Sequence, residues 1–463
     1  SPCRNADRPA KHIDQFPERV LLPRELIRLP KDTIQGEMER HNVGTTGQRN
    51  VGHRFRNRFS VINIFFQRKV IRFYICICFW ILYNVIITHE RKKCKSFLAF
   101  SDKKMKDINF ASDILRHYDL DHISTPYGNG HINSTYLVGT SPRFILQRIN
   151  TDIFRDPDGV MENILAVTSF LRAKIVAAGG DPMRETLTVV PTTDNHSYYR
   201  TPDGDCYRVY LFIENAVSID SAPSPEVFAE SARAFGKFQR MLSDFPAEKL
   251  HETIPHFHDT PDRLRIFRET LAKDPVGRAA SVEPEIRFAL DRAAEMGIIT
   301  DAIADGSVPL RVTHNDTKLN NVMLDAKTGK GICVIDLDTV MPGSMLYDYG
   351  DSLRFGASTA AEDERDLDKV SFDLNYFRAY TKAYLEALGD SVTPRELELL
   401  PFAAKLMTLE CGMRFLTDHI DGDHYFRIHR ENHNLDRCRT QFKLVADMER
   451  KADEMSRIVA ELC

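Results

Sequence analysis

The stretch His314-Asn315-Asp316-Thr317-Lys318-Leu319-Asn320-Asn321 precedes an apolar run at residues 332–335, and a second acidic pair, Asp336 and Asp338, follows that run directly. An apolar run of this length between polar loops predicts a buried strand that carries Asp336 at its end. Carboxylates and amides at such positions are the groups that phosphoryl transfer needs to align a hydroxyl and to hold Mg²⁺. The pattern therefore predicts a phosphoryl-transfer site.

The spacing also predicts a role for each polar side chain. Asp316 is expected to be the catalytic carboxylate that orients or deprotonates the attacking hydroxyl. Asn321, five residues further along a short loop, is expected to be a neutral metal ligand, and Asp336 is expected to be the ionised one. Lys318 is expected to meet phosphate charge as a second catalytic group.

The order and separation of these residues resemble the protein-kinase catalytic loop H-R-D-L-x-x-x-N, with Asp336 in the place of the D-F-G aspartate. No A-P-E sequence follows, and Ile-Asp-Leu-Asp replaces D-F-G, as in the small-molecule branch that includes aminoglycoside and choline kinases. The resemblance implies an α+β, two-lobed protein-kinase-like fold. We expect a small N-lobe with an antiparallel sheet at residues 105–218 and a larger, mainly helical C-lobe at residues 219–463.

Within that branch, residues 105–463 resemble the bacterial N-acetylhexosamine 1-kinases of the aminoglycoside phosphotransferase and choline kinase-like family. This resemblance implies that ATP, with Mg²⁺, phosphorylates the anomeric C1 hydroxyl of N-acetylglucosamine or N-acetylgalactosamine. The stretches that carry it are V-T-H-N-D-T-K-L-N-N-V-M-L-D at 312–325, D-L-D-T-V-M-P-G at 336–343, Y-G-N-G-H-I-N at 127–133, Y-D-Y-G-D at 347–351 and E-C-G-M-R-F at 410–415.

A glycine turn precedes the hairpin that residues 133–138 and 144–149 are expected to form. Glycines there let backbone N–H groups approach the nucleotide phosphates without an intervening side chain. The alternative is a plain turn, because Asn133 stands where a third glycine would be. The cofactor-binding residues expected in this turn are Gly128, Asn129, Gly130, His131 and Ile132.

Three further N-lobe residues are predicted to bind the cofactor. Arg148 stands where kinases carry the lysine of V-A-I-K, and its guanidinium can clamp phosphate oxygens. Glu162, on a helix expected at 161–178, is its predicted ion-pair partner. Glu214 begins a hinge that can offer backbone groups to adenine. The alternative for Arg148 is a solvated residue on an edge strand.

After Pro225 the apolar residues recur at three- and four-residue intervals, which predicts packed helices. The helices are expected at 226–242, 263–271, 283–296, 372–388, 394–418 and 436–461. The family resemblance places the sugar beside the catalytic aspartate and against the C-terminal helices. The substrate-binding residues expected there are Asp338, Arg414, Tyr425 and Arg427.

The charge distribution and the spacing of the cysteines limit the classes of protein that the sequence can represent. Residues 1–104 hold about 21 Lys and Arg against about 9 Asp and Glu, whereas the remainder holds about 41 against about 57. The acidic body argues against a nucleic-acid partner. The family resemblance implies ATP and a small sugar as the partners. The five cysteines after Met105 are widely spaced and include no C-x-x-C pair, which predicts reduced thiols and a cytoplasmic protein. The oligomeric state is left open.

Residues 1–104 differ from the rest of the chain. They lack a helical or strand period, and an apolar run at 73–88 has basic residues on both sides. That run is short for a membrane span, and it contains Asn84. We expect upstream sequence before an initiating Met105 or a disordered segment, with a membrane anchor as the less favoured alternative.

Other functions remain open from the sequence. The acceptor of the same kind of kinase can be an aminoglycoside, choline or homoserine, and an acidic body is compatible with such cations. Arg414 and Arg427 argue against a cationic acceptor. A kinase fold without catalysis, used as a binding module, is the alternative from another class. It is disfavoured because Asp316, Asn321 and Asp336 are all present.

Overall fold

The computed structural model describes residues 113–120, 124–128 and 133–463. The expectations for residues 1–104 and for Asn129, Gly130, His131 and Ile132 concern positions outside these ranges. His117–Leu120 and Thr125–Cys463 belong to one compact unit. Among the described residues, none of the helices is both long and apolar enough to span a membrane.

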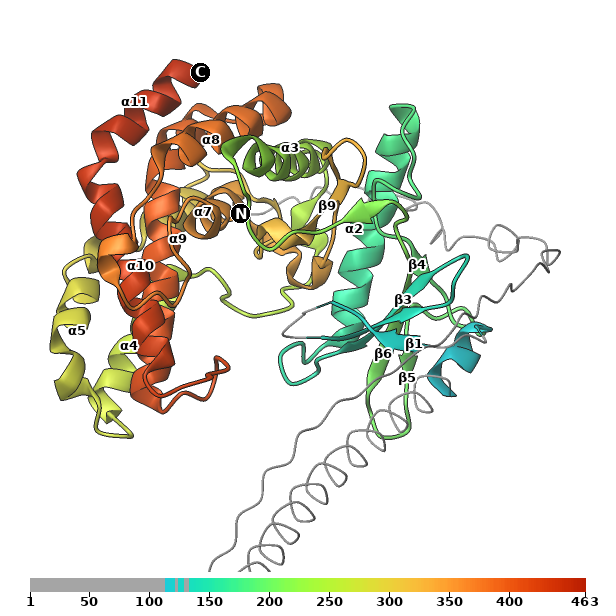
Figure 1. Ribbon diagram of the computed structural model, residues 1–463, viewed down its shortest axis with the longest axis horizontal. Coiled ribbons are helices and arrows are strands. Elements are labelled where there is room, and N and C mark those ends of the chain that lie inside the picture. Colours follow the sequence, from blue (N-terminus) through green and yellow to red (C-terminus); the bar gives the residue numbers. More distant parts are fainter. Residues whose placement is uncertain (1–112, 121–123, 129–132) are drawn as a thin grey trace, which may run out of the picture. The chain divides into compact units, whose positions relative to one another are not determined.

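The N-lobe is built on an antiparallel sheet (Figure 1). Its strands are β1 (Ser124–Pro126), β2 (Ser134–Val138), β3 (Phe144–Ile149), β4 (Val189–Val190), β5 (Tyr199–Arg200) and β6 (Cys206–Leu211). They follow the order β1-β2-β3-β6-β4, and β5 also pairs with β6. In the register of β3 and β6, Gln147 lies opposite Arg208 and Arg148 lies opposite Tyr207. Because side chains alternate along a strand, Gln147 and Arg148 point to opposite faces of the sheet.

The helix that follows β3 covers this sheet. It is α2 (Pro157–Ala177), and it begins at Asp156, whose side chain accepts a hydrogen bond from the Gly159 N–H at 3.1 Å. Proline at the first helical position supports that start, because its missing N–H would have no partner there. Ile164 and Val167 of α2 belong to the same buried cluster as Ile149 of β3.

The C-lobe is mainly helical. Its helices are α3 (Pro225–Met241), α4 (Thr260–Lys273), α5 (Glu283–Leu290), α6 (Ile298–Ala304), α7 (Met345–Gly356), α8 (Leu374–Leu388), α9 (Pro394–Asp421), α10 (His433–Arg450) and α11 (Ala452–Leu462). Its short strands are β7 (Ala216–Val217), β8 (Arg311–Thr313), β9 (Val322–Asp325), β10 (Gly331–Val334) and β11 (Met341–Gly343). β9 pairs with β7 and β10, and β8 pairs with β11. The structure confirms the α+β, kinase-like fold class.

Several C-lobe helices differ from the sequence prediction. The helix expected at 283–296 ends at Leu290 as α5 and is followed by a separate 3-10 turn at Ala293–Glu295, and α6 was not predicted. Helix α7 was not predicted, because the residues from Met345 to Arg354 are all buried and so show no alternation between a polar and an apolar face. The single helix expected at 436–461 is two helices, α10 and α11, which meet at Lys451. There the Lys451 Nζ donates to the Phe372 carbonyl at 2.7 Å, which ties the junction to the segment before α8.

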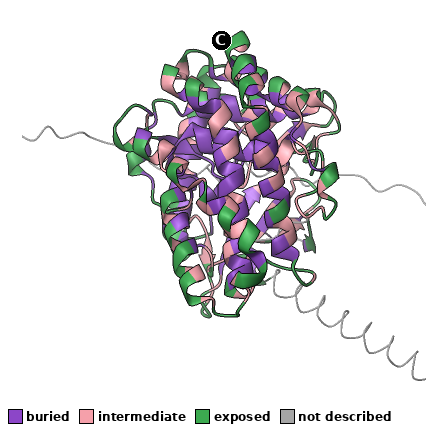
Figure 2. Ribbon diagram, turned by 90° about the vertical axis from the view of Figure 1, so that its left-hand side faces the viewer, coloured by how far each residue is buried: buried purple, intermediate pink, exposed green. Residues whose placement is uncertain are grey.

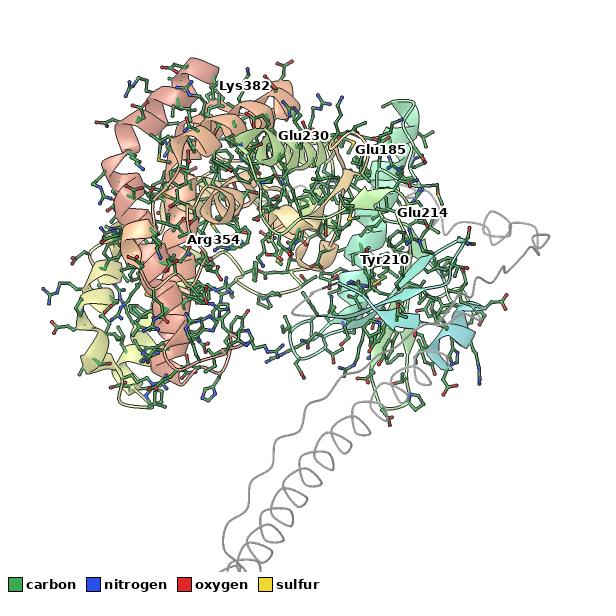
Figure 3. All side chains as sticks on the ribbon, in the orientation of Figure 1. Glu185, Tyr210, Glu214, Glu230, Arg354 and Lys382 are labelled. Carbon is green, nitrogen blue, oxygen red and sulfur yellow. The ribbon has the colours of Figure 1, made fainter. Side chains whose placement is uncertain are left out.

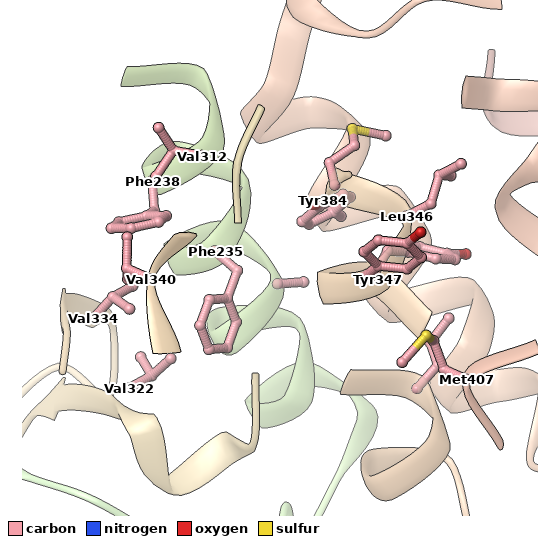
Figure 4. Close-up of a cluster of buried hydrophobic side chains, with 14 of the residues drawn as sticks. Phe235, Phe238, Val312, Val322, Val334, Val340, Leu346, Tyr347, Tyr384 and Met407 are labelled. Atoms are coloured by element: carbon pink, nitrogen blue, oxygen red, sulfur yellow. The ribbon is translucent and has the colours of Figure 1, made fainter. Parts of the chain in front are cut away.

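A buried core lies beneath the short strands of the C-lobe. Phe235 and Phe238 of α3 pack with valines from β8, β9 and β10 and with Val340, as Figure 4 shows. Buried residues gather on the inner sides of the helices, and the exposed ones lie on the outside (Figure 2). Because this core supports β8, β9 and β10, it also fixes the loops that connect them.

Candidate active site

The catalytic loop, residues 314–321, connects β8 to β9 and brings together three predicted residues. The Lys318 Nζ lies 2.8 Å from Asp316 Oδ1. The Asn321 side-chain amide donates to the Asp316 carbonyl at 2.8 Å and to Oδ2 at 3.3 Å. Because the amide nitrogen of Asn321 faces Asp316, its amide oxygen is left for another partner.

A buried carboxylate from α7 holds the backbone of this loop. Asp348 accepts from the backbone N–H groups of His314 at 3.0 Å and Asn315 at 2.7 Å, and from the Gln239 side chain at 2.7 Å. Burial raises the pKa of Asp348, and these hydrogen bonds oppose the shift. Asn315 has a positive φ of 67°, a backbone conformation that needs such support in a residue other than glycine. Sequence reasoning did not assign this role to Asp348.

The His314 ring connects the loop to the strand that precedes Asp336. Its Nε2 lies 2.9 Å from the Ile335 carbonyl, and its Nδ1 accepts from the Asp316 N–H at 3.3 Å. Both ring nitrogens have a hydrogen-bond partner when a proton is on Nε2, which then donates to the Ile335 carbonyl. The Ile335 N–H also donates to the Asn321 carbonyl at 2.9 Å, which sets Asp336 beside Asn321.

Asp336 follows β10 and adopts a left-handed conformation with φ 59°. Burial raises its pKa to about 6, with smaller contributions from Asp338 and Asp316, whereas Arg208 and His314 oppose the increase. Three carboxylates therefore gather here, and a cation would relieve their repulsion. This electrostatic arrangement favours a metal ion or a bound cationic group at Asp336.

Asp316 and Lys318 stabilise each other's charged forms. Burial would raise the pKa of Asp316, but the Lys318 ammonium, with smaller effects of His314 and Arg354, holds it below its usual value. The Asp316 carboxylate in turn raises the pKa of Lys318. Asp316 is consequently ionised at neutral pH, as a group that accepts a proton must be.

Asp338, a predicted substrate residue, is engaged inside the protein. It is 2% exposed, its Oδ1 lies 2.5 Å from the Arg208 Nη1, and its Oδ2 accepts from the Asn133 side chain at 2.7 Å. Asn133 and Arg208 belong to the N-lobe, so this carboxylate joins the two lobes. The structure therefore places Asp338 in an interlobe contact rather than on an open surface.

A second buried guanidinium lies behind Lys318. Arg354 of α7 is 5% exposed, and its Nε and Nη1 lie 2.9 Å from Asp351 and 2.8 Å from Glu362 (Figure 3). Sequence reasoning missed this group, since nothing in the kinase-like motif places an arginine there. The helical spacing of Asp351 and Arg354 is the one signal that could have suggested the pair.

The predicted cofactor residues of the N-lobe are dispersed. Arg148 is half-exposed and pairs with Asp205 at 2.6 Å, on the sheet face opposite to that of Gln147. Glu162, its expected partner, instead contacts the His251 Nε2 at 2.8 Å. Side chains alternate between the two faces of a strand, so Arg148 of β3 points away from the face that carries Gln147. The guanidinium that reaches the carboxylates of Asp336 and Asp338 is that of Arg208 on β6.

The remaining predicted cofactor residues flank the sheet. Glu214 makes a two-point contact with Arg143 through both carboxylate oxygens, and its carbonyl faces Arg184 at 3.4 Å. The carboxylate is thus occupied, and the backbone after Glu214 leads into β7. Gly128 has a φ of 74°, which favours glycine, and no neighbouring atom would contact a side chain there.

The predicted substrate residues of the C-lobe lie at the end of α9. The Arg414 guanidinium lies 5.3 to 5.7 Å from the ring centres of Phe257, Tyr425 and Phe426. Its Nη2 also lies 3.4 Å from the Tyr425 hydroxyl. Tyr425 is 60% exposed, and Arg427 is exposed as well. Arg414 and Tyr425 are therefore adjacent, and Arg427 lies two residues further on the same loop.

A chain of buried contacts connects this region to the catalytic loop. Glu410, one turn before Arg414, accepts from Thr260 at 2.6 Å and lies 2.8 Å from the His258 Nδ1. The His258 Nε2 lies 3.2 Å from the carbonyl of Asn315, directly before Asp316. Contacts through His258 therefore connect the part of α9 that carries Arg414 to the loop that carries Asp316.

The donor set fits a magnesium ion shared with a nucleotide. Within residues 113–120, 124–128 and 133–463, no group of three or more His, Cys, Asp and Glu side chains is arranged to hold a metal ion. Mg²⁺ in nucleotide-binding enzymes usually takes one or two protein oxygens together with phosphates and waters. Asn321 and Asp336 supply such a pair. The five described cysteines are free thiols.

The fold and this constellation define a kinase-like phosphotransferase. The model of the phosphotransferase enzyme family (APH) matches residues 124–389, and the chain belongs to that family.

Solved structures show the same fold. One is a microcompartment-associated aminopropanol kinase, 18% identical, with a TM-score of 0.52, covering 75% of this chain and 98% of that chain. Another is an aminoglycoside phosphotransferase from Alicyclobacillus acidocaldarius, 14% identical, with a TM-score of 0.47, covering 76% and 94%. A choline kinase from Streptococcus pneumoniae is 13% identical, with a TM-score of 0.44, covering 73% and 98%.

Proposed function

We propose that this protein transfers the γ-phosphoryl group of ATP to the C1 hydroxyl of an N-acetylhexosamine and so makes the sugar 1-phosphate. The observation that carries the choice of acceptor is the environment of Arg414. Its guanidinium, three aromatic rings and a tyrosine hydroxyl gather on the acceptor side of α9. Such a surface offers hydrogen-bond donors to hydroxyl and acetamide oxygens, together with apolar faces for a sugar ring.

Each residue has a defined task in this proposal. The sugar oxygen forms a bond to the γ-phosphorus, the bond from that phosphorus to the bridging oxygen breaks, and ADP leaves. Asp316 aligns the C1 hydroxyl and receives its proton. Because the transition state is loose, alignment and charge neutralisation contribute more than early removal of the proton.

The metal and the nucleotide are assigned to residues of both lobes. Asn321 and Asp336 would hold Mg²⁺, which when bound neutralises charge on the phosphate oxygens. Lys318 would meet the transferred group from the other side. Gly128 and the hinge after Glu214 are proposed to contact the phosphates and the adenine. Arg148, which pairs with Asp205 on the opposite face of the sheet, has no part in this assignment.

Cationic acceptors are the second candidate, since solved structures of this fold include kinases of aminopropanol, ethanolamine and choline. Among the described contacts Arg414 makes no ion pair within 4 Å, although the buried Glu410 carboxylate one turn before it attracts its charge, and the exposed end of the guanidinium would repel a cation. This repulsion favours a neutral acceptor.

A panel of acceptors tests the proposal. The full chain is incubated with ATP and Mg²⁺ and with N-acetylglucosamine, N-acetylgalactosamine, choline, ethanolamine or an aminoglycoside, and the products are analysed by phosphorus NMR. We expect a C1 phosphate signal with at least one N-acetylhexosamine, split by the anomeric proton. Phosphorylation of an amino alcohol alone, with no sugar phosphate, would overturn the choice of acceptor and leave the phosphotransferase class intact.

A further inference from the structure

Arg208 of β6 is the one guanidinium among the described residues that reaches the acidic cluster from the N-lobe. Its strand lies inside the sheet, between β3 and β4, and its side chain is 1% exposed, which is rare for a charged residue. Its Nε and Nη2 donate to the Gln147 side-chain oxygen at 3.1 and 2.9 Å, and its Nη1 pairs with Asp338. A buried charge with such complete contacts is held in a single position.

The contacts of Asp338 continue this arrangement toward the metal ligand. Asn133, which also accepts from the Asn150 N–H at 3.0 Å, binds the second oxygen of Asp338. The Asp338 carbonyl accepts from the Thr253 hydroxyl at 3.0 Å. The turn from Leu337 to Thr339, immediately after Asp336, is therefore held by the N-lobe through a side chain and by the C-lobe through the backbone.

The same turn is tied to the catalytic loop. The Thr339 hydroxyl donates to the His314 carbonyl at 2.7 Å, and the Asn315 side chain donates to the Thr339 carbonyl at 2.8 Å. Asp336 itself has a left-handed backbone, which persists in a residue other than glycine only when its surroundings hold it. A displacement of Asp338 would consequently move Asp336 relative to Asp316.

We propose that Arg208 is a positioning residue for the metal site: by fixing Asp338 it sets the orientation of Asp336 and couples strand β6 of the N-lobe to binding of the metal-bound nucleotide. Arg208 is fully buried and most of its donors are occupied, so it acts through Asp338 and does not need to contact phosphate. The proposal rests on the proposed phosphoryl-transfer function, but it does not depend on the acceptor.

The facing residues on β3 and β6 provide a matched set of variants. Arg208→Gln removes the charge. The double variant Gln147→Arg with Arg208→Gln moves the same guanidinium to the facing strand, because these positions are directly opposite in the register. Arg148→Gln is the control, since it removes a guanidinium from the neighbouring position whose partner is Asp205. The double variant Arg208→Gln with Asp338→Asn removes both charges of the buried pair. It replaces Arg208→Gln in the measurements if that single variant does not fold.

The measurement is binding of a non-hydrolysable ATP analogue by calorimetry, with and without Mg²⁺, together with the thermal unfolding midpoint of each full-length variant. We expect Arg208→Gln to lose about 10- to 100-fold of the Mg²⁺-dependent affinity, the range for partners that orient a metal ligand. Metal-free nucleotide binding should be unchanged. The exchanged pair should recover part of the loss, and Arg148→Gln should match the wild type.

Each outcome either supports or contradicts the positioning role of Arg208. A folded Arg208→Gln protein with the wild-type Mg²⁺ response would overturn the proposal, as would an equal loss in Arg148→Gln. If only the neutral pair folds, a wild-type Mg²⁺ response in that variant would overturn it too. No acceptor is present in these measurements. A failure of sugars as acceptors in the panel above would therefore refute the proposed function without affecting this result.

Discussion

The catalytic loop and the proposed acceptor loop, residues 422–432 between α9 and α10, are held in different ways. In the catalytic loop, His314, Asn315 and Thr317 are at most 4% exposed, and both backbone and side chains are bonded. The acceptor loop is fixed through its backbone, because Asp418 accepts from three consecutive N–H groups at 2.7 to 2.9 Å. Some of its side chains, such as Tyr425 and Arg427, are exposed, whereas Asp423 pairs with Arg278 and Arg430 pairs with Asp363.

We expect the catalytic loop to determine the reaction and the proposed acceptor loop to determine which acceptor binds. The side chains of the catalytic loop are determined by buried contacts, so they suit one reaction and tolerate little change. The acceptor loop keeps its path through Asp418 and can vary its exposed side chains without loss of the fold.

The strongest test of the catalytic side is Asp336→Ala. We expect it to abolish turnover and to weaken Mg²⁺-dependent nucleotide binding, because it removes the charged metal ligand. Asn321→Ala is the matched variant, and raised Mg²⁺ should rescue part of its activity, since the lost ligand is neutral. Titration of Mg²⁺ against rate compares the two, and full activity in excess chelator would exclude a metal-dependent reaction.

Asp316→Asn should have the next largest effect. The amide keeps the shape of the side chain and cannot accept the proton, so kcat should fall at least about 100-fold. Nucleotide affinity should remain close to that of the wild type. Asp203→Asn, a change at an exposed turn residue, is the control. Wild-type turnover of the Asp316 variant in steady-state kinetics would remove this carboxylate from the chemistry.

Asp348→Asn tests the rigidity of the catalytic loop. Its carboxylate faces two backbone donors, and an amide nitrogen turned toward them would leave a buried donor unsatisfied. We expect a loss of about 1–3 kcal/mol in the free energy of unfolding, together with lower kcat. Denaturant titration gives the first quantity. A stable, fully active variant would mean that the loop does not depend on α7.

Arg414→Ala tests the acceptor side, where the comparison predicts a change in binding rather than in chemistry. The acceptor KM should rise about 10- to 100-fold, the range for a lost hydrogen bond to a charged group. The KM for ATP and the unfolding midpoint should change little. Arg427→Ala is the companion variant, with a smaller expected effect because Arg427 is exposed. An unchanged acceptor KM in both variants would place the sugar elsewhere.

The smallest effect is expected at the front of the chain. A protein that begins at Met105 should keep the activity and solubility of the full chain, because each motif assigned above follows that residue. Specific activity and gel filtration compare the two proteins. Loss of activity or aggregation in the shorter protein would show that residues 1–104 contribute to the folded enzyme.

The catalytic loop could be predicted from sequence, because its residues are consecutive and their chemistry depends on short spacings. Asp316, Lys318 and Asn321 are brought together by the loop itself. The helical C-lobe was also predicted, from the periodicity of its apolar residues. The prediction missed α7 because a helix that is buried on all sides has no periodic polar face. The acceptor remains a proposal, since exposed side chains carry no such local constraint.

Tertiary structure decided which distant charges meet. Arg148 was predicted to bind phosphate because it stands where kinases carry a lysine. The direction of a side chain depends on strand register, however, and the residue that reaches Asp338 is Arg208 of β6. Asp348 and Arg354 likewise become functional neighbours only because α7 packs beneath the catalytic loop. Local spacing therefore determines the reacting groups, whereas the charges that position and balance them come from long-range packing, which neither spacing nor composition encodes.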